Sequence, residues 1–180
     1  IGGGFVMMKY GTTLAIKYEG NINFENVAVS NFGQMKYYED TDPRFGITYL
    51  NGMEGTDQLP QSLKNCVLYN GYAPGVGVFS TDNFKMEGTV IHRAVHGGVK
   101  IISSAKSTVN NNICTKHYHM SAMQQMVRGE SQLIEEERWP ACFDMDGAGD
   151  GSENSFDGNR ASGSGTIGIR GCGGWKYVYF

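Results

Sequence analysis

Acidic residues gather in one glycine-rich stretch, DMDGAGDG, at residues 144–151. Calcium takes about six to eight oxygen ligands from a backbone that folds back on itself, and alternating Asp with intervening Gly can supply them. The stretch departs from the EF-hand template because Ala148 stands at the third ligand position. We keep two interpretations. Either Asp144, Asp146 and Asp150 bind calcium as a cofactor, or they lie in a solvated loop and bind nothing.

A second acidic group, Asp40 and Asp42, lies beside Arg44. In polysaccharide lyases, carboxylates hold calcium while a basic residue removes a proton from the sugar, and this trio superficially offers both. A turn explains it better, because Asp before Pro43 commonly caps a turn and Arg44 can pair with a nearby carboxylate. We therefore assign no catalytic residues.

Histidines could bind a metal ion at two places. His92 and His96 are four residues apart, and His117 and His119 are two apart. Zinc would need a further ligand such as Cys114. The surrounding sequence is typical of strands and turns, so we favour ordinary turn or surface histidines.

The four cysteines have no C-x-x-C spacing, which argues against common zinc and thioredoxin-type motifs. Their even number permits two disulfides with three connectivities, which would indicate an extracellular protein. Buried free thiols are the alternative. The disulfide candidates are Cys66, Cys114, Cys142 and Cys172.

The composition limits the class of protein. With 180 residues and 40% hydrophobic residues, the chain suits one domain over residues 1–180 with a real core. A net charge of −3 without a basic block makes nucleic acid a poor partner. No apolar run approaches the roughly 20 residues of a membrane span. Both ends look like strands, so we expect a fragment of a larger extracellular protein.

The elements that would position these residues follow a repeat. Val67 and Val90 are 23 positions apart, as are Val90 and Ile113, and Val76 and Val99. Strand-like runs at a constant offset indicate coiled β-structure, in which each short strand buries its face only by stacking on the next turn. Further copies of the motif begin near Phe24 and Phe156, with strands at 46–49, 165–169 and 175–179.

Three segments break the repeat and are predicted as loops: Gln34–Arg44, Asn51–Gln61 and Lys116–Asp150. Helix-forming residues between Lys116 and Arg138 suggest one short helix in the last of them. Asn111 and Gly158 are 47 positions apart, close to two turns of the repeat, so we expect this excursion to occupy about one turn.

These observations predict an all-β fold, a right-handed parallel β-helix of about five to seven turns. Val67, Val90 and Ile113 are expected to form an inner apolar column. A β-sandwich is the second choice, since it explains alternation but not equal spacing. Asparagines are expected to stack at one corner and to bond along the axis, with Gly88 in place of one of them; they are Asn26, Asn65 and Asn111.

Several motifs together resemble a known family. They are FGQ at 32–34, DPR at 42–44, GVGVFSTD at 75–82 and VIHRAVHGG at 90–98. In this succession, from about residue 26 to 102, the chain is similar to the β-helix region of fibrocystin and fibrocystin-like proteins. It departs from their pattern at Ser80 and His96. The resemblance implies an extracellular, largely non-catalytic module of very large cell-surface proteins associated with cilia.

We therefore predict a non-enzymatic structural and adhesive module of a cell surface, on a cilium or flagellum, that assembles laterally with other cell-surface or extracellular proteins. The alternative is a β-helix protein that binds or cleaves polysaccharide, similar to hyaluronan-processing or pectin-cleaving proteins, with carbohydrate as its ligand. A viral fibre segment is a third option that shares the logic of a stiff rod.

Overall fold

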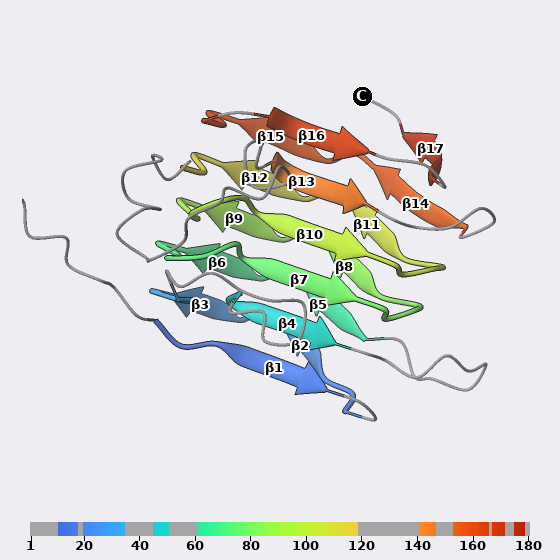
Figure 1. Cartoon of the computed structure of the whole chain (residues 1–180), viewed down its shortest axis with the longest axis horizontal. Helices are drawn as coiled ribbons and strands as arrows, with labels where there is room; N and C mark the ends of the chain where they lie inside the picture. Colours follow the sequence, from blue (N-terminus) through green and yellow to red (C-terminus); the bar gives the residue numbers. More distant parts are fainter. Residues whose placement is uncertain are drawn as a thin grey trace, which may run out of the picture.

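Short parallel strands make up all the regular structure in the described part of the chain, as Figure 1 shows. The computed structural model describes residues 11–17, 20–34, 45–50, 61–118, 141–146, 153–165, 167–171 and 175–178. The predicted all-β fold is confirmed over these residues. The segment expected to hold a short helix falls mostly outside them.

The strands form three parallel sheets, and each sheet extends along the axis of the coil from one turn to the next (Figure 1). The first sheet contains β1 (Leu14–Lys17), β4 (Ile47–Leu50), β7 (Val76–Phe79), β10 (Val99–Ile102), β13 (Ala141–Asp146) and β16 (Ile167–Gly171). The second contains β2 (Asn23–Glu25), β5 (Ser62–Lys64), β8 (Lys85–Glu87), β11 (Thr108–Asn110), β14 (Asn154–Asp157) and β17 (Trp175–Val178). The third contains β3 (Ala28–Ser30), β6 (Val67–Tyr69), β9 (Val90–His92), β12 (Ile113–Thr115) and β15 (Arg160–Ser162). Consecutive strands belong to different sheets, so the chain coils as a right-handed parallel β-helix.

The 23-residue repeat corresponds to one turn of the coil. Val67 pairs with Val90, and Val90 pairs with Ile113, in the third sheet. Val76 pairs with Val99 in the first. The predicted phase is confirmed at each of these positions.

The predicted face of the third sheet is wrong. Val67 and Ile113 are 40% and 38% exposed, so this column lies outside rather than inside. The inner column is one residue further along each strand and consists of Leu68, Ile91 and Cys114, all at most 1% exposed. Because side chains alternate across a strand, a shift of one residue exchanges the two faces while leaving the period unchanged.

A left-handed residue turns the chain at the corner between the second and third sheets. Asn26, Asn65 and Asn111 have φ values of 57°, 50° and 56°, as expected for stacked asparagines at one corner. Gly88 has φ 61°, and a Cβ there would lie 2.5 Å from the Asn65 side-chain oxygen. Asparagine adopts this backbone angle on three other turns, so glycine is needed at 88 for the Asn65 amide that packs on it.

The hydrogen-bonded ladder of polar side chains lies one residue after this corner. The Thr89 hydroxyl accepts from the Cys66 amide at 3.3 Å. The Asn112 side-chain oxygen accepts a hydrogen bond from the backbone N–H of Thr89 at 2.9 Å. The Asn159 side-chain oxygen accepts one from the backbone N–H of Asn112 at 3.0 Å. Bonding along the axis was expected, but from the corner asparagines. These inward-pointing residues instead satisfy backbone donors that the turn leaves unpaired.

Two lengths differ from the prediction near the C-terminal end. Strand β11 pairs directly with β14, so the 47 residues from Asn111 to Gly158 form one long turn rather than two. The loop predicted up to Asp150 is also wrong over β13, which lies in register between β10 and β16. Its residues 141–145 are all buried. A strand buried on both faces lacks the polar and apolar alternation by which strands are recognised.

Two of the predicted loops fall between Asn26 and Asn65, and β2 pairs with β5 across this longer turn. The two loops expected within it lie mainly at 35–44 and 51–60, outside the described residues. The strand predicted between them is β4.

Strands β4 and β7 of the first sheet differ from the third sheet in being buried on both faces. All four residues of β4 and of β7 are buried. One face packs into the main core, where the rings of Tyr49 and Phe84 lie 4.9 Å apart. On the other face, Phe79 stacks on Phe45 at 5.6 Å and packs beside Leu50 in a second apolar cluster.

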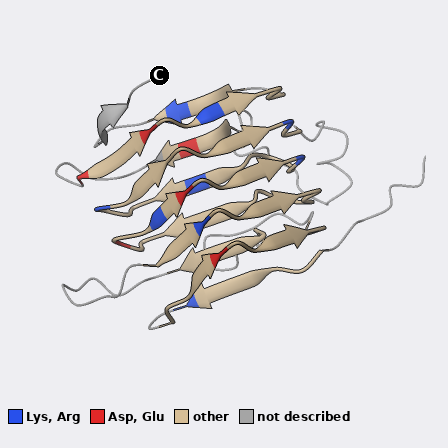
Figure 2. Ribbon diagram, turned by 180° about the vertical axis from the view of Figure 1, so that it is seen from behind, with Lys and Arg blue, Asp and Glu red and all other residues tan. Residues whose placement is uncertain are grey.

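Charges of both signs are interspersed on the back of the coil, as Figure 2 shows. In the second sheet, Glu25, Lys64 and Glu87 occupy equivalent positions on successive turns. Opposite charges on neighbouring strands favour this register. No helix among the described residues offers an apolar stretch long enough to cross a bilayer.

Candidate functional site: a buried cystine and histidine

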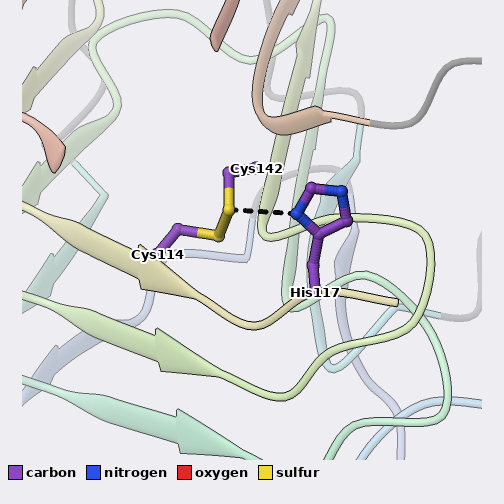
Figure 3. Close-up of side chains that lie close together, drawn as sticks. All are labelled: Cys114, His117 and Cys142. Atoms are coloured by element: carbon purple, nitrogen blue, oxygen red, sulfur yellow. Dashed lines mark hydrogen bonds between the residues drawn. A yellow bond between two sulfur atoms is a disulfide. The ribbon is translucent and has the colours of Figure 1, made fainter. Parts of the chain in front are cut away.

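A disulfide joins the third sheet to the first. Cys114 is the central residue of β12 and Cys142 the second residue of β13, and their sulfur atoms are bonded with the Cα atoms 5.7 Å apart (Figure 3). Both side chains are at most 1% exposed. The bond closes a chain segment with a sequence separation of 28.

Glycine makes room for this cystine at the corner of the coil. Gly46, Gly75, Gly98 and Gly168 occupy the positions equivalent to Cys142 on other turns. A Cβ at Gly98 would lie 2.6 Å from the Cys142 carbonyl oxygen and 2.7 Å from the Cys114 sulfur. Cys142 therefore stands in a corner column that is glycine at these four positions, while Thr13 is the equivalent residue on the first described turn.

His117 lies directly beside the disulfide. It follows Lys116, whose left-handed backbone (φ 52°) turns the chain after β12. Its Nδ1 is 3.1 Å from the Cys142 sulfur, and the side chain is 1% exposed (Figure 3).

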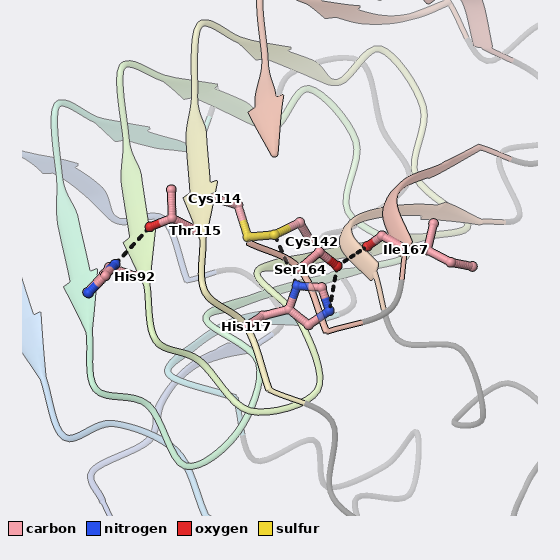
Figure 4. The surroundings of a disulfide bond; sticks show 7 residues. All are labelled: His92, Cys114, Thr115, His117, Cys142, Ser164 and Ile167. Carbon is pink, nitrogen blue, oxygen red and sulfur yellow. Dashed lines mark hydrogen bonds between the residues drawn. A yellow bond between two sulfur atoms is a disulfide. The ribbon is translucent and has the colours of Figure 1, made fainter. Parts of the chain in front are cut away.

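Ser164 fixes the ring of His117 from the opposite side. The Ser164 hydroxyl donates to the carbonyl of Ile167 at 2.8 Å and lies 3.1 Å from His117 Nε2 (Figure 4). A hydroxyl carries one hydrogen, so Ser164 accepts from an Nε2–H group while it donates to Ile167. In this tautomer Nδ1 carries a lone pair that points at the sulfur.

The structure brings together one of the predicted histidines and two of the predicted cysteines. The ligand atoms of Cys114, His117 and Cys142 lie within 4.8 Å of one another, the one such group of three or more within the described ranges. Cys142 was not foreseen as their neighbour. A signal for it was the Gly-Gly pair at 97–98, since glycine beneath a buried cysteine leaves space for a bulky cross-link.

The other histidines are placed separately. His92 Nδ1 lies 2.7 Å from the Thr115 hydroxyl, on the outward side of the third sheet (Figure 4). His96 has a left-handed backbone (φ 63°) in the turn before β10. His119 lies outside the described residues, so a metal site shared by His117 and His119, which the sequence did not favour, stays a hypothesis.

Cys66, a predicted disulfide partner, is a free and buried thiol. This corrects the expectation of two disulfides that include it. The physical reason is its place in the polar ladder, where its backbone amide donates to Thr89 and its thiol donates to the Lys64 carbonyl at 3.2 Å. Cys172 lies outside the described residues.

Asp144, a predicted calcium ligand, lies on β13 and is 6% exposed. The solvated-loop interpretation is therefore wrong for this residue. Its carboxylate accepts two hydrogen bonds from Arg170, one from Nε at 2.8 Å and one from Nη2. A calcium ion would have to compete with this bidentate pair. Asp146 ends β13, and Asp150 lies outside the described residues, so the calcium site itself stays a prediction.

Basic and acidic residues share one row of the first sheet, which was not foreseen. Lys100 lies in register with Asp144 on the next turn, and Asp144 lies in register with Arg170 on the turn after that. The signal was hidden because these turns are 44 and 26 residues long rather than 23. The other predicted acidic group, at Asp40 and Asp42 with Arg44, lies outside the described residues.

Tyr49 is the one described group with a strongly displaced pKa. Burial disfavours the phenolate and raises the pKa of Tyr49 well above its usual value, and the neighbouring Cys66 raises it further. Its hydroxyl donates to the Ser62 carbonyl at 3.5 Å. Tyr49 is thus a neutral core residue and not an acid or base at physiological pH.

Comparison of the sequence with known protein families supports the β-helix fold. A family model described as the right-handed β-helix region matches residues 8–132, which is more than half of the chain. The chain belongs to the right-handed β-helix family. The family match includes every strand from β1 to β12.

Two relatives of this β-helix are similar to much of the chain. Human (Homo sapiens) fibrocystin-L is 30% identical over 96 residues, which cover 53% of this chain and 2% of the relative. Mouse (Mus musculus) fibrocystin-L is 27% identical over 153 residues, covering 85% of the chain and 3% of the relative. The chain thus spans a few hundredths of the length of these proteins. No solved structure matches it. The fibrocystin-like resemblance predicted from the motifs is confirmed.

Proposed function

We propose that this β-helix is a structural and adhesive module of a large extracellular protein at a cell surface, on a cilium or flagellum. In this role the stiff coil presents one long side to other cell-surface or extracellular proteins. The similarity to fibrocystin-L supports the setting, because members of that family are expected at cell surfaces.

The observation that carries the proposal is an exposed apolar row on the third sheet. Val67, Val90 and Ile113 lie in register on three successive turns, with Val67 and Ile113 near 40% exposed. Tyr69, 39% exposed, lies beside this row. A flat row of β-branched side chains on a rigid coil suits contact with another protein, since little side-chain entropy is lost on binding.

We further infer that the module has no enzymatic activity. Polysaccharide cleavage by a β-helix would need a carboxylate and a base free to reach the sugar. In the row of the first sheet formed by Lys100, Asp144 and Arg170, the carboxylate of Asp144 is 6% exposed and is bound by Arg170. Incubation with hyaluronan or polygalacturonate should yield no unsaturated products, and their appearance would revive the polysaccharide-cleaving alternative.

Adhesion of cells that display the chain tests the module itself. The variant Val67→Lys with Ile113→Lys places two charges in the apolar row and should abolish adhesion. The matched control, Thr108→Lys with Ser155→Lys, adds the same charge to the second sheet, where these residues also lie in register. Adhesion that is absent from the wild type, or equal in both variants, would contradict the proposal.

A further inference from the structure

We propose that Cys114, Cys142 and His117 form a binding site for a thiolate-preferring ion such as Zn²⁺ when their disulfide is reduced. The same three side chains would then hold the coil together in two forms, by a covalent bond when oxidised and by a metal ion when reduced. Nothing in the adhesive role requires this site, so the two proposals stand or fall separately.

The types of ligand and their burial favour such an ion. Two thiolates and one imidazole are ligands that Zn²⁺ and Cu(I) prefer, and a Cys₂His set leaves one position for water or another group. All three side chains are at most 1% exposed, and their ligand atoms already lie within 4.8 Å of one another. In a tetrahedral zinc site, sulfur atoms at about 2.3 Å from the metal are about 3.8 Å apart. After reduction, the Cys114 and Cys142 sulfur atoms therefore need only move apart to this separation, at the corner between β12 and β13.

The orientation of His117 is the second observation. Ser164 holds the Nε2 side of the ring, so the Nδ1 lone pair faces Cys142 at 3.1 Å (Figure 4). Metal-binding histidines commonly donate their second ring nitrogen to a neighbouring oxygen, which fixes the tautomer and the ring plane. The Ser164 hydroxyl supplies that oxygen here. His117 is thus prepared as a ligand before any metal is bound.

The conversion between the two forms balances with a dithiol as reductant. The dithiol breaks the Cys114–Cys142 bond by exchange, becomes a disulfide itself and leaves two protein thiols. One Zn²⁺ then binds both sulfurs and releases their two protons, while neutral His117 binds through Nδ1. Exchange with an oxidised dithiol reverses the sequence: the protein disulfide re-forms, the dithiol takes up two protons, and the ion is released.

The test uses the full chain with Cys66→Ser and Cys172→Ser, so that only the two site cysteines remain. The chain is reduced without oxygen and titrated with Co²⁺, whose bonds to thiolates absorb in the near ultraviolet and whose tetrahedral sites absorb in the visible. We expect one equivalent of Co²⁺ to give both bands, excess Zn²⁺ to remove them, and two protons to be released. The oxidised chain is the control and should give neither band. A reduced chain without these bands would overturn the proposal.

Two variants separate a metal site from a simple dithiol. His117→Ala should change the visible bands and weaken binding, and an unchanged spectrum would show that the histidine is not a ligand and overturn the proposal. Ser164→Ala leaves all three ligands and should weaken Zn²⁺ binding by about 10-fold or more. If His117→Ala does not fold, the Ser164→Ala titration and a melting temperature that Zn²⁺ raises only in the reduced chain decide the question.

Discussion

The first and third sheets of the coil share one period but differ in what covers them. Strands β4 and β7 of the first sheet are buried on both faces, whereas β6 of the third sheet alternates between exposed and buried residues. The same parallel pairing of strands therefore carries side chains buried on both faces in the first sheet and an exposed apolar row in the third sheet. Outward side chains in this protein have two distinct roles, structural in the first sheet and available for contact in the third.

Truncating an outward aromatic residue tests this difference most strongly. Phe79 is 6% exposed and stacks on Phe45, so Phe79→Ala should lower the free energy of unfolding by about 3 to 5 kcal/mol. Tyr69 points outward from the third sheet and is 39% exposed, so Tyr69→Ala should cost less than about 1 kcal/mol. Urea denaturation measures both. Equal losses would show that the two outer faces are alike.

Adjacent residues of β6 sharpen the comparison within one strand. Leu68 is fully buried, and Leu68→Ala should cost about 2 to 4 kcal/mol because it removes apolar contacts and leaves a cavity. Val67→Ala on the exposed side should cost within about 1 kcal/mol. A large loss at Val67 in thermal or urea unfolding would return the inner column to the position first predicted from the repeat.

Tyr49 links the buried first sheet to the effect of pH. Because its pKa is raised by folding, the neutral phenol is favoured in the native state. This stability is present below a pH of about 10 and is lost as the pH rises further, where the unfolded phenol ionises first, by up to about 1.4 kcal/mol per unit. Urea unfolding at rising pH should show this loss in the wild type and in Tyr69→Phe. The loss should be smaller in Tyr49→Phe, and an identical profile would contradict the burial effect.

Removing calcium should have the smallest effect on stability of all these changes. It tests the outer row of the first sheet. Arg170 already pairs with Asp144 through two hydrogen bonds, so we expect no change in melting temperature when a calcium chelator is added. A fall in the melting temperature with chelator, restored by Ca²⁺, would instead establish the site predicted at Asp144, Asp146 and Asp150. Asp144→Asn and Asp146→Asn would then show which of these residues takes part.

The sequence predicts the period of this fold better than its faces. Spacing alone identifies that Val67, Val90 and Ile113 stack, because equivalent residues must recur once per turn. It does not say which side they face, since the inner and outer columns of a parallel coil are both apolar here. A cue was available at the corner, because a left-handed Asn65 directs Cys66 inward and hence Val67 outward.

The candidate site was predictable only in its parts. Cys114 and His117 were considered together because they are close in the chain. Cys142 and Arg170 reach their partners through turns whose lengths depart from the repeat, so no spacing rule connects them to Cys114 and Asp144. Long-range partners of this kind depend on where an insertion enters a turn, which a periodic pattern cannot record.

The hydrogen bonds between equivalent residues run along the axis of the coil, and this direction determines how the protein bears load. A pull along the axis acts on the bonds between one turn and the next, so the turns can separate one at a time. A pull across the axis is shared by the six strands of the first sheet. The cystine spans two sheets between β12 and β13, and it ties together the longer of the two turns that carry insertions.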